Sequence, residues 1–275
     1  MKVSKNSYYH WLKNKGVKRQ KASLVYLKER INMLFDQSKQ IYGSKRIKKA
    51  LEREGLCYSV SYIASLMREL GLKSVLKKKY IATTDSKHDL RVADNKLNRE
   101  FISSKLGEKW VSDITYIKVG SSWNYLTTII DLADRKIVSW VVSQDMTTEN
   151  TVLKAWKKAI KTRQITDDHI FHSDRGVQYA SRQMQQYFND PIKNQSQSMS
   201  RKGNCWDNAV AESFFKTIKY ECLNRYKFSN YMEVYSRIDE YINWYNYQRL
   251  HSSLDYLTPA EMELKIKIKQ LNNVA

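Results

Sequence analysis

The chain has 275 residues, 42% of them hydrophobic, so it is long enough for one mid-sized domain and one smaller domain. No apolar run approaches the roughly 20 residues of a transmembrane helix, and the N-terminus lacks the apolar core of a signal peptide, so we expect a cytoplasmic protein. The formal net charge of +20 indicates a polyanionic partner, because Lys and Arg gain affinity by neutralising phosphates.

The positive charge is concentrated at the N-terminal end. Residues 1–80 hold 20 Lys or Arg against 5 Asp or Glu, a net charge of +15, which leaves +5 for the rest. DNA is the favoured polyanion. An acidic membrane surface is the weaker alternative, because no strongly amphipathic lysine-rich helix stands alone. The three cysteines share no CxxC spacing, so we expect reduced thiols and neither a disulfide framework nor a zinc site.

Residues 1–80 are predicted to form three short helices, at 24–38, 44–55 and 59–71, in each of which apolar residues recur at helical spacing. Ser44 is expected to cap the second helix, and the last two helices each end at a glycine. Three short helices with a basic surface are typical of a helix-turn-helix DNA-binding domain, whose last helix would lie in the major groove. A plain helical bundle with solvated Lys and Arg is the alternative.

The outward side of the second helix supplies the candidate DNA contacts of this domain. Its apolar residues recur on one side, so the basic residues between them are expected to face outward. Side chains of this kind would contact backbone phosphates without selecting a base sequence. The four candidates are Lys45, Arg46, Lys48 and Lys49.

The rest of the chain divides by composition into three parts. A polar segment at 81–108 shows weak periodicity and is predicted to be a linker. A second domain is expected at 109–225, where β-branched and aromatic residues begin to alternate with polar ones. Residues 226–275 are predicted to form a C-terminal helix and a basic tail.

The second domain begins with three strands and continues with alternating helices and strands. The expected elements are strands at 110–119, 123–134 and 136–145, a helix at 149–161, a strand at 169–174 and a helix at 208–221. The order β-β-β-α-β-α-β-α predicts an α/β, ribonuclease-H-like fold, which is a mixed five-stranded sheet flanked by helices. Functional side chains in such sheets gather near strand ends.

Three carboxylates fall on separate elements of this domain. Asp113 lies within the first strand, Asp174 ends the fourth, and Glu212 lies on the last helix, away from its predicted buried stripe. Phosphodiester cleavage and strand transfer need an activated nucleophile and a stabilised leaving oxygen, and two Mg²⁺ ions about 4 Å apart supply both. Carboxylates are the ligands that this hard cation prefers. We therefore predict that the three residues are catalytic and hold two Mg²⁺ ions, for which Mn²⁺ can substitute.

Basic residues lie near these carboxylates in the sequence. Lys219 is nearly two helical turns after Glu212 and shares its side of the helix, and Lys216 is one turn away, so both are predicted to bind a DNA phosphate. Arg201 and Lys202 precede the helix and are further candidates for DNA contact. The predicted buried stripe of the helix consists of Trp206, Val210, Phe214 and Ile218.

Several of these residues also have a purely structural interpretation. Asp174 precedes an Arg-Gly pair and, taken alone, is a typical turn residue. His172 is expected to pack or hydrogen-bond near the end of its strand rather than to bind a metal. The C-terminal tyrosines and Trp244 are expected to pack against other side chains rather than to stack on bases. Weaker candidates for DNA contact are Arg249 and His251.

Long motifs carry a family resemblance. They are WVSDITYI at 110–117, FHSDRGVQYAS at 171–181, QSMSRKGNCWDNAVAESFFKTIKYE at 197–221 and YNYQRLHSSLDYLTPAE at 245–261. With YGSKRIKKAL and SLMRELGLK in the N-terminal domain, the chain resembles the OrfB catalytic product of bacterial insertion-sequence transposases over nearly its whole length. These transposases are related to retroviral integrases.

The resemblance implies a Mg²⁺-dependent DDE transposase that nicks the 3′ end of its element and uses the freed hydroxyl to attack a second DNA position. Asp113, Asp174 and Glu212 match the family's triad, and Lys219 matches its basic residue. It also implies a homo-oligomer on DNA at the bacterial nucleoid, and an upstream frame product fused to this chain by ribosomal frameshifting. The spacing from Asp174 to Glu212 is slightly longer than is usual in the family, and the loop at 189–197 is expected to absorb the excess.

Two other functions are compatible with this fold. One is a DNA-binding regulator with an inactive catalytic domain, which would occupy element ends; the three intact carboxylates argue against it. The other is a structure-specific nuclease, which would cleave DNA without joining it.

Overall fold

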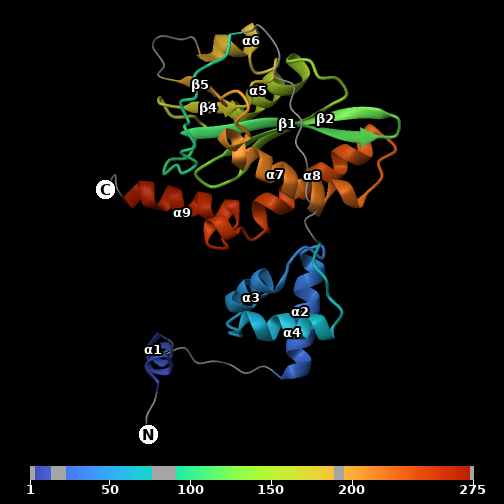
Figure 1. Ribbon diagram of the computed structural model, residues 1–275, viewed down its shortest axis with the longest axis vertical. Coiled ribbons are helices and arrows are strands. Elements are labelled where there is room, and N and C mark those ends of the chain that lie inside the picture. Colours follow the sequence, from blue (N-terminus) through green and yellow to red (C-terminus); the bar gives the residue numbers. More distant parts are fainter. Residues whose placement is uncertain (1–3, 14–22, 76–90, 189–194, 273–275) are drawn as a thin grey trace. The chain divides into compact units, whose positions relative to one another are not determined.

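The computed structural model describes residues 4–13, 23–75, 91–188 and 195–272. Within these ranges no helix combines the length and the apolar character needed to cross a bilayer. Figure 1 shows the helices and strands along the chain. The chain divides into two compact units, Met1–Val75 and Leu76–Ala275.

The first unit is helical. Its helices are α1 (Lys5–Lys13), α2 (Leu24–Gln37), α3 (Ser44–Arg53) and α4 (Val60–Glu69). Helix α3 packs against α2 and α4, and the buried residues of the three helices belong to the apolar patterns that predict them, among them Leu27, Ile31, Ile47, Leu51 and Ile63. Leu24, at the start of the pattern in α2, is 50% exposed. The chain leaves α3 at Gly55 and α4 at Gly71, with φ of +79° and +70°, a conformation that favours glycine.

The start of α3 differs from the prediction. Gly43 holds the N-cap position and offers no side chain to cap the helix, and Ser44 is already helical, so the prediction that Ser44 is the cap is wrong. The reason is local: Gly43 has extended backbone, and the chain turns into the helix directly after it. Helix α4 does begin with a serine cap, because the Ser59 hydroxyl accepts a hydrogen bond from the Tyr62 amide at 3.1 Å.

Several basic side chains of α3 already have partners within the first unit. Lys48 and Lys49 both pair with Glu52, at 2.6 and 2.9 Å. The Arg46 guanidinium lies over the Tyr42 ring, 5.6 Å from its centroid. Lys45 is exposed. DNA contact by these four residues stays a prediction, and DNA would have to compete with Glu52 for two of them.

The second unit contains the predicted mixed sheet of five strands in the order β3-β2-β1-β4-β5. Strands β1, β2 and β3 form an antiparallel meander, and β4 and β5 run parallel to β1. A fifth strand, for which no position was predicted, completes the sheet. The strands are β1 (Lys109–Val119), β2 (Ser122–Asp131), β3 (Ile137–Ser143), β4 (Ile170–Ser173) and β5 (Ser196–Met199).

Helices cover both sides of this sheet. Figure 1 shows α5 and α6 on one side and α7 and α8 on the other. Helix α5 continues a π-helical segment, Glu149–Leu153. The helices are α5 (Lys154–Thr162), α6 (Arg182–Gln185), α7 (Ala209–Glu221), α8 (Tyr231–Tyr247) and α9 (Pro259–Asn272). The residues at the C-terminus that were predicted to form a basic tail are thus largely helical.

An aromatic core joins the sheet to α5. Trp110 of β1, Trp156 of α5 and Phe171 of β4 are fully buried, and the Trp110 and Trp156 rings lie edge to face at 5.8 Å. Because side chains alternate along a strand, the neighbours of Trp110 on β1 point to the opposite side of the sheet, toward α7. The alternation of β1 therefore directs Asp113 away from this core.

A buried ion pair ties α7 to the segment after α8. The Arg249 guanidinium donates to both Glu221 oxygens, with Nε to Oε2 at 2.7 Å and Nη2 to Oε1 at 2.6 Å. The Tyr241 hydroxyl donates to the same carboxylate at 2.7 Å. Arg249 is 4% exposed and His251 is 6% exposed, with its ring against Tyr245. The prediction that Arg249 and His251 contact DNA is therefore wrong. The predicted packing is confirmed for Trp244, Tyr241 and Tyr245, whereas Tyr235 and Tyr247 are exposed.

Two further segments differ from expectation. Trp206 lies in the 3-10 turn Cys205–Asn208 that precedes α7 and is 69% exposed, so it is not part of the buried stripe of α7. Residues 91–108, predicted as linker, lie on the second unit, where Leu97 is 1% exposed and its amide donates to the Ser198 hydroxyl. The loop at 189–197, expected to absorb the longer spacing, lies largely outside the described residues.

The buried histidine at the start of β4 generates a testable pH dependence. His169 Nδ1 donates to the Gly107 carbonyl at 2.7 Å, its ring packs against Trp110 and Trp156, and Nε2 has no partner among the described residues. Burial lowers the pKa of His169 to about 4. The unfolded chain therefore binds a proton at higher pH than the folded protein does.

We expect the free energy of unfolding to fall by about 2–3 kcal/mol as the pH drops from about 6.5 to about 4, because of His169 alone. His169→Asn keeps an amide donor for the Gly107 carbonyl but does not titrate. Denaturant unfolding of both proteins across this pH range measures the difference. Parallel pH profiles for the two proteins would contradict the assignment.

Candidate active site

The pairing of β1 with β4 brings two of the predicted carboxylates together. The strands are parallel, and Val111 of β1 lies opposite His172 of β4. Asp113 is two residues after Val111, and Asp174 is two residues after His172, in the turn that follows β4, so both lie just beyond the paired residues; the charge of Asp174 acts on Asp113. The Asp174 carboxylate accepts a hydrogen bond from the Gly176 amide at 3.0 Å, which fixes the turn after β4.

Glu212 approaches from the helical layer. Helix α7 packs against β1, and Glu212 lies in its first turn with its side chain 22% exposed. Phe214 and Ile218 are buried, as the predicted stripe requires, so the carboxylate and the apolar stripe lie on different sides of the helix. The three carboxylates therefore come from β1, the turn after β4, and α7.

The electrostatics of Asp113 show that the charges of the other two carboxylates reach it. Burial raises the pKa of Asp113 well above its ordinary value, and the neighbouring Asp174 and then Glu212 raise it further. The Ile114 amide, which donates to Asp113 Oδ1 at 2.8 Å, and the charge of Lys219 lower the pKa of Asp113. This cluster of negative charge is costly in itself and would be stabilised by a cation.

The three carboxylates are suitable ligands for a hard divalent cation. They offer carboxylate oxygens only, which Mg²⁺ prefers to sulfur or imidazole nitrogen. His172 is not one of these ligands, because Nδ1 lies 2.8 Å from the Ser198 hydroxyl and the side chain is buried, as predicted. Across the described ranges, no three acidic, His or Cys side chains are gathered tightly enough to enclose an ion as they stand. Ligation by all three carboxylates would require side-chain adjustment.

Two lysines of α7 lie beside these carboxylates. Lys216 Nζ is 3.4 Å from Glu212 Oε2, one turn along the helix. The charge of Lys219 acts on Asp113. Lys219 thus lies on the side of α7 that the spacing from Glu212 predicts. Lys216 is exposed and Lys219 is half-buried, so a phosphate that enters from solvent can reach both.

A fourth carboxylate, Asp207, fixes the turn that leads into α7. Its side chain is fully buried, and it accepts hydrogen bonds from the Arg201 amide and guanidinium, from Arg99 Nε at 2.7 Å and from Asn95 Nδ2 at 2.9 Å. The Arg201 guanidinium, the largest cause, holds the pKa of Asp207 well below its ordinary range. Asn208, the next residue, donates to the Ser112 carbonyl of β1 at 3.0 Å. These contacts fix the turn Cys205–Asn208, which leads directly into the helix that carries Glu212.

The Asp207 network changes the interpretation of a predicted DNA contact. Arg201 donates from Nε and Nη2 to Asp207, at 2.9 and 2.8 Å, so its guanidinium is engaged in holding the turn. Lys202 is exposed, and its contact with DNA stays a prediction. The role of Asp207 was not visible in the sequence, because Asn95 and Arg99 lie in the segment predicted to be a linker.

The sequence also concealed an aromatic cluster near Asp174. Tyr116 of β1 and Trp123 of β2 are half-exposed, and their rings lie edge to face at 6.2 Å. Burial, Tyr125 and Asp174 raise the pKa of Tyr116. Tyr179 is buried, and its hydroxyl lies 2.8 Å from the Ser112 hydroxyl. The alternation of β1 predicts that Tyr116 faces away from Asp113, but its exposure depends on what covers the sheet.

Asp207→Asn is expected to destabilise the second unit by about 2 kcal/mol, because it removes the negative charge to which three residues donate hydrogen bonds. The loss is limited because the two arginine side chains can be hydrated instead. Asp239→Asn, at an exposed position on α8, removes the same charge and serves as the control, with an expected effect below about 0.5 kcal/mol. Denaturant unfolding measures both. Equal stability of the two variants would show that Asp207 does not hold the turn.

The chain matches known families over both units. Residues 103–205 and 194–259 each match an integrase core domain, and residues 25–80 match an HTH-like domain. Among solved structures, a chain of the simian T-cell lymphotropic virus intasome in complex with PP2A regulatory subunit B56 gamma superposes with a TM-score of 0.50 at 13% identity, covering 78% of this chain and 69% of that one. With the sheet order, this likeness confirms the ribonuclease-H-like fold.

Relatives of similar length are insertion-element proteins. The chain is 39% identical to the insertion element IS600 uncharacterized 31 kDa protein of Shigella sonnei, over 96% of both chains. It is 34% identical to the putative transposase InsK for IS150 of Escherichia coli K12, over 94% of this chain and 89% of the relative. It is 31% identical to transposase InsF for IS3A of the same strain, over 96% and 92%. The chain therefore belongs to the family of insertion-sequence transposases with an integrase core, which are polynucleotidyl transferases that act on DNA.

Proposed function

We propose that this chain is the DDE-type catalytic subunit of a transposase, which nicks the 3′ end of a DNA element and joins the freed hydroxyl to a second DNA position. The observation that carries the proposal is the convergence of Asp113, Asp174 and Glu212 from three elements, with the charges of two acting on the third. Family membership alone would not identify the reacting residues. The electrostatic coupling of these three carboxylates supports their assignment.

The cofactor that suits these residues is Mg²⁺, as two ions, with Mn²⁺ as a substitute. Asp113, Asp174 and Glu212 would hold it, and its charge would activate the attacking oxygen and stabilise the leaving one. The protein's own contribution is placement. The β1–β4 register holds the two aspartates, the Asp207 network holds the start of α7, and Lys216 and Lys219 bind the phosphate next to the scissile bond.

Other parts of the chain would bring DNA to this site. The first unit, which matches an HTH-like domain, would bind the element end, with α4 in the major groove and the basic side of α3 on phosphates. We propose that the chain works as a homo-oligomer on DNA at the bacterial nucleoid, and that an upstream frame product joined by frameshifting adds further DNA binding. A regulator or a pure nuclease would share the fold but would give no joined product.

Asp113→Asn, Asp174→Asn and Glu212→Gln are each expected to reduce cleavage and joining by at least about a thousandfold, because each removes an anionic ligand that would hold the cations at the reacting phosphate. Affinity for the element end should change less than about twofold. The assay incubates the full chain, with and without the upstream product, with a labelled element terminus and Mg²⁺, and separates cleaved from joined DNA. Asp168→Asn, in an exposed loop, is the matched control.

The outcomes separate the candidate functions. Joined product from the unmodified chain supports a transposase, cleavage without joining supports a nuclease, and binding without chemistry supports a regulator. Retained cleavage in any of the three carboxylate variants would show that the site is wrongly assigned.

Lys219→Gln is expected to slow joining by about 10- to 100-fold, the loss of one charge-assisted contact to a phosphate. Lys219→Arg keeps the charge and should retain most of the activity. Single-turnover joining rates at saturating DNA measure the effect on the chemical step rather than on binding. Similar rates for the Gln variant and the unmodified chain would remove Lys219 from the site.

A further inference from the structure

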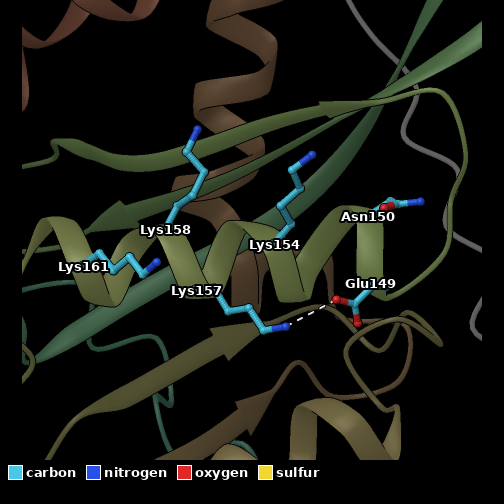
Figure 2. A pocket seen from close by; sticks show the side chains of 6 residues that line it. All are labelled: Glu149, Asn150, Lys154, Lys157, Lys158 and Lys161. Carbon is cyan, nitrogen blue, oxygen red and sulfur yellow. Dashed lines mark hydrogen bonds and ion pairs between the residues drawn. The ribbon is translucent and has the colours of Figure 1, made fainter.

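The exposed side of α5 carries a row of lysines that the proposed active site does not use. Ala155, Trp156 and Ala159 are buried against the sheet, and four lysines occupy the opposite side of the helix. Figure 2 shows them along the helix axis, with Lys157 reaching toward Glu149. They line a shallow hollow of about 340 Å³ together with Glu149 and Asn150. The four residues are Lys154, Lys157, Lys158 and Lys161.

The charges in this row repel one another with little internal compensation. Lys157 pairs with Glu149 at 3.3 Å, and Lys158 donates to the Trp140 carbonyl at 3.0 Å. Burial and then the charge of Lys154 lower the pKa of Lys158. In the described part of the chain, Lys154 and Lys161 make no hydrogen bond or ion pair. Like charges three and four residues apart destabilise a helix, so the row is costly to the free protein and would be stabilised by an external anion.

The row begins at the same edge of the sheet as the carboxylates. The segment before Glu149 contains Met146, whose carbonyl accepts a hydrogen bond from Gln178 Nε2 at 3.0 Å and whose sulfur lies 3.3 Å from the Tyr116 hydroxyl. Burial, Tyr125 and the charge of Asp174 raise the pKa of Tyr116, so Asp174 lies near this ring. The π-helical segment and α5 therefore lead away from the neighbourhood of Asp174, and DNA that passes this edge can follow the helix.

We infer that the lysine side of α5 binds the backbone phosphates of duplex DNA next to the active site. This inference rests on the proposed function and adds the path of the DNA. Duplex DNA is favoured over a second copy of the chain because each copy carries a net charge of +20. Phosphate contacts of this kind position a duplex without reading its sequence, so any duplex serves as ligand.

The test compares two double variants with the same charge. Lys154→Gln with Lys161→Gln removes two charges from the row, and Lys265→Gln with Lys269→Gln removes two from the exposed side of α9. Glutamine keeps the helix propensity of both helices. Affinity of each full chain for a duplex of arbitrary sequence is measured without divalent metal at several salt concentrations. Loss of two phosphate contacts lowers the slope of log K against log salt by about 1.8.

The α5 variant is expected to show this reduced slope, so that between about 50 and 200 mM salt it loses about tenfold less affinity than the unmodified chain. The α9 variant should match the unmodified chain, and Lys154→Arg with Lys161→Arg should restore the slope. Equal slopes for the α5 and α9 variants would overturn the inference, as would an α5 variant that altered self-association without DNA and left the slope unchanged. Because this measurement needs no chemistry, failure of joining by the unmodified chain would count against the proposed function only.

Discussion

The parallel pairing of β1 with β4 is the constraint on which the site depends. It brings Asp113 of β1 near Asp174, in the turn after β4, at half-buried positions where burial and then the charge of Asp174 raise the pKa of Asp113. Side chains on a flexible loop would move apart to relieve that repulsion. Paired strands resist this separation, because moving them apart would break several hydrogen bonds and disturb the aromatic core around Trp156.

The third carboxylate depends on a different device. Glu212 belongs to a helix, and the helix is aligned by the turn before it, where Asp207 binds two arginines and an asparagine and Asn208 binds β1. Asp207 is a positioning residue, because its hydrogen bonds hold the turn that precedes α7. The protein thus uses one ionised aspartate, paired with two arginines, to fix the start of the helix that carries Glu212.

Much of this arrangement could be predicted from sequence because it follows from short-range periodicity. Alternation along β1 and the helical stripe of Phe214 and Ile218 place Asp113 and Glu212 correctly. The errors arise where the periodicity stops or where partners are distant. The predicted stripe extends to Trp206, beyond the start of α7. Arg249 is a candidate for DNA contact in the sequence because nothing near it reveals its pairing with Glu221.

The α5 lysines show the same limit. Their spacing makes an exposed side predictable, but only the structure shows that one lysine pairs with Glu149 and another lies on Trp140, leaving two for other contacts. Fold and carboxylate placement are thus accessible to local rules, whereas the division of charged residues between internal pairing and DNA is not.

The Glu221–Arg249 pair has a consequence for the decay of such genes. A premature stop codon between Glu221 and Arg249 would remove the counter-charge of a carboxylate buried on the catalytic helix, and an unpaired buried charge is strongly destabilising. Shortened copies would then be degraded rather than persist as competitors that occupy element ends. A mobile element that encodes this fold would therefore lose the whole enzyme, and keep no folded fragment, when its reading frame ends between these two residues.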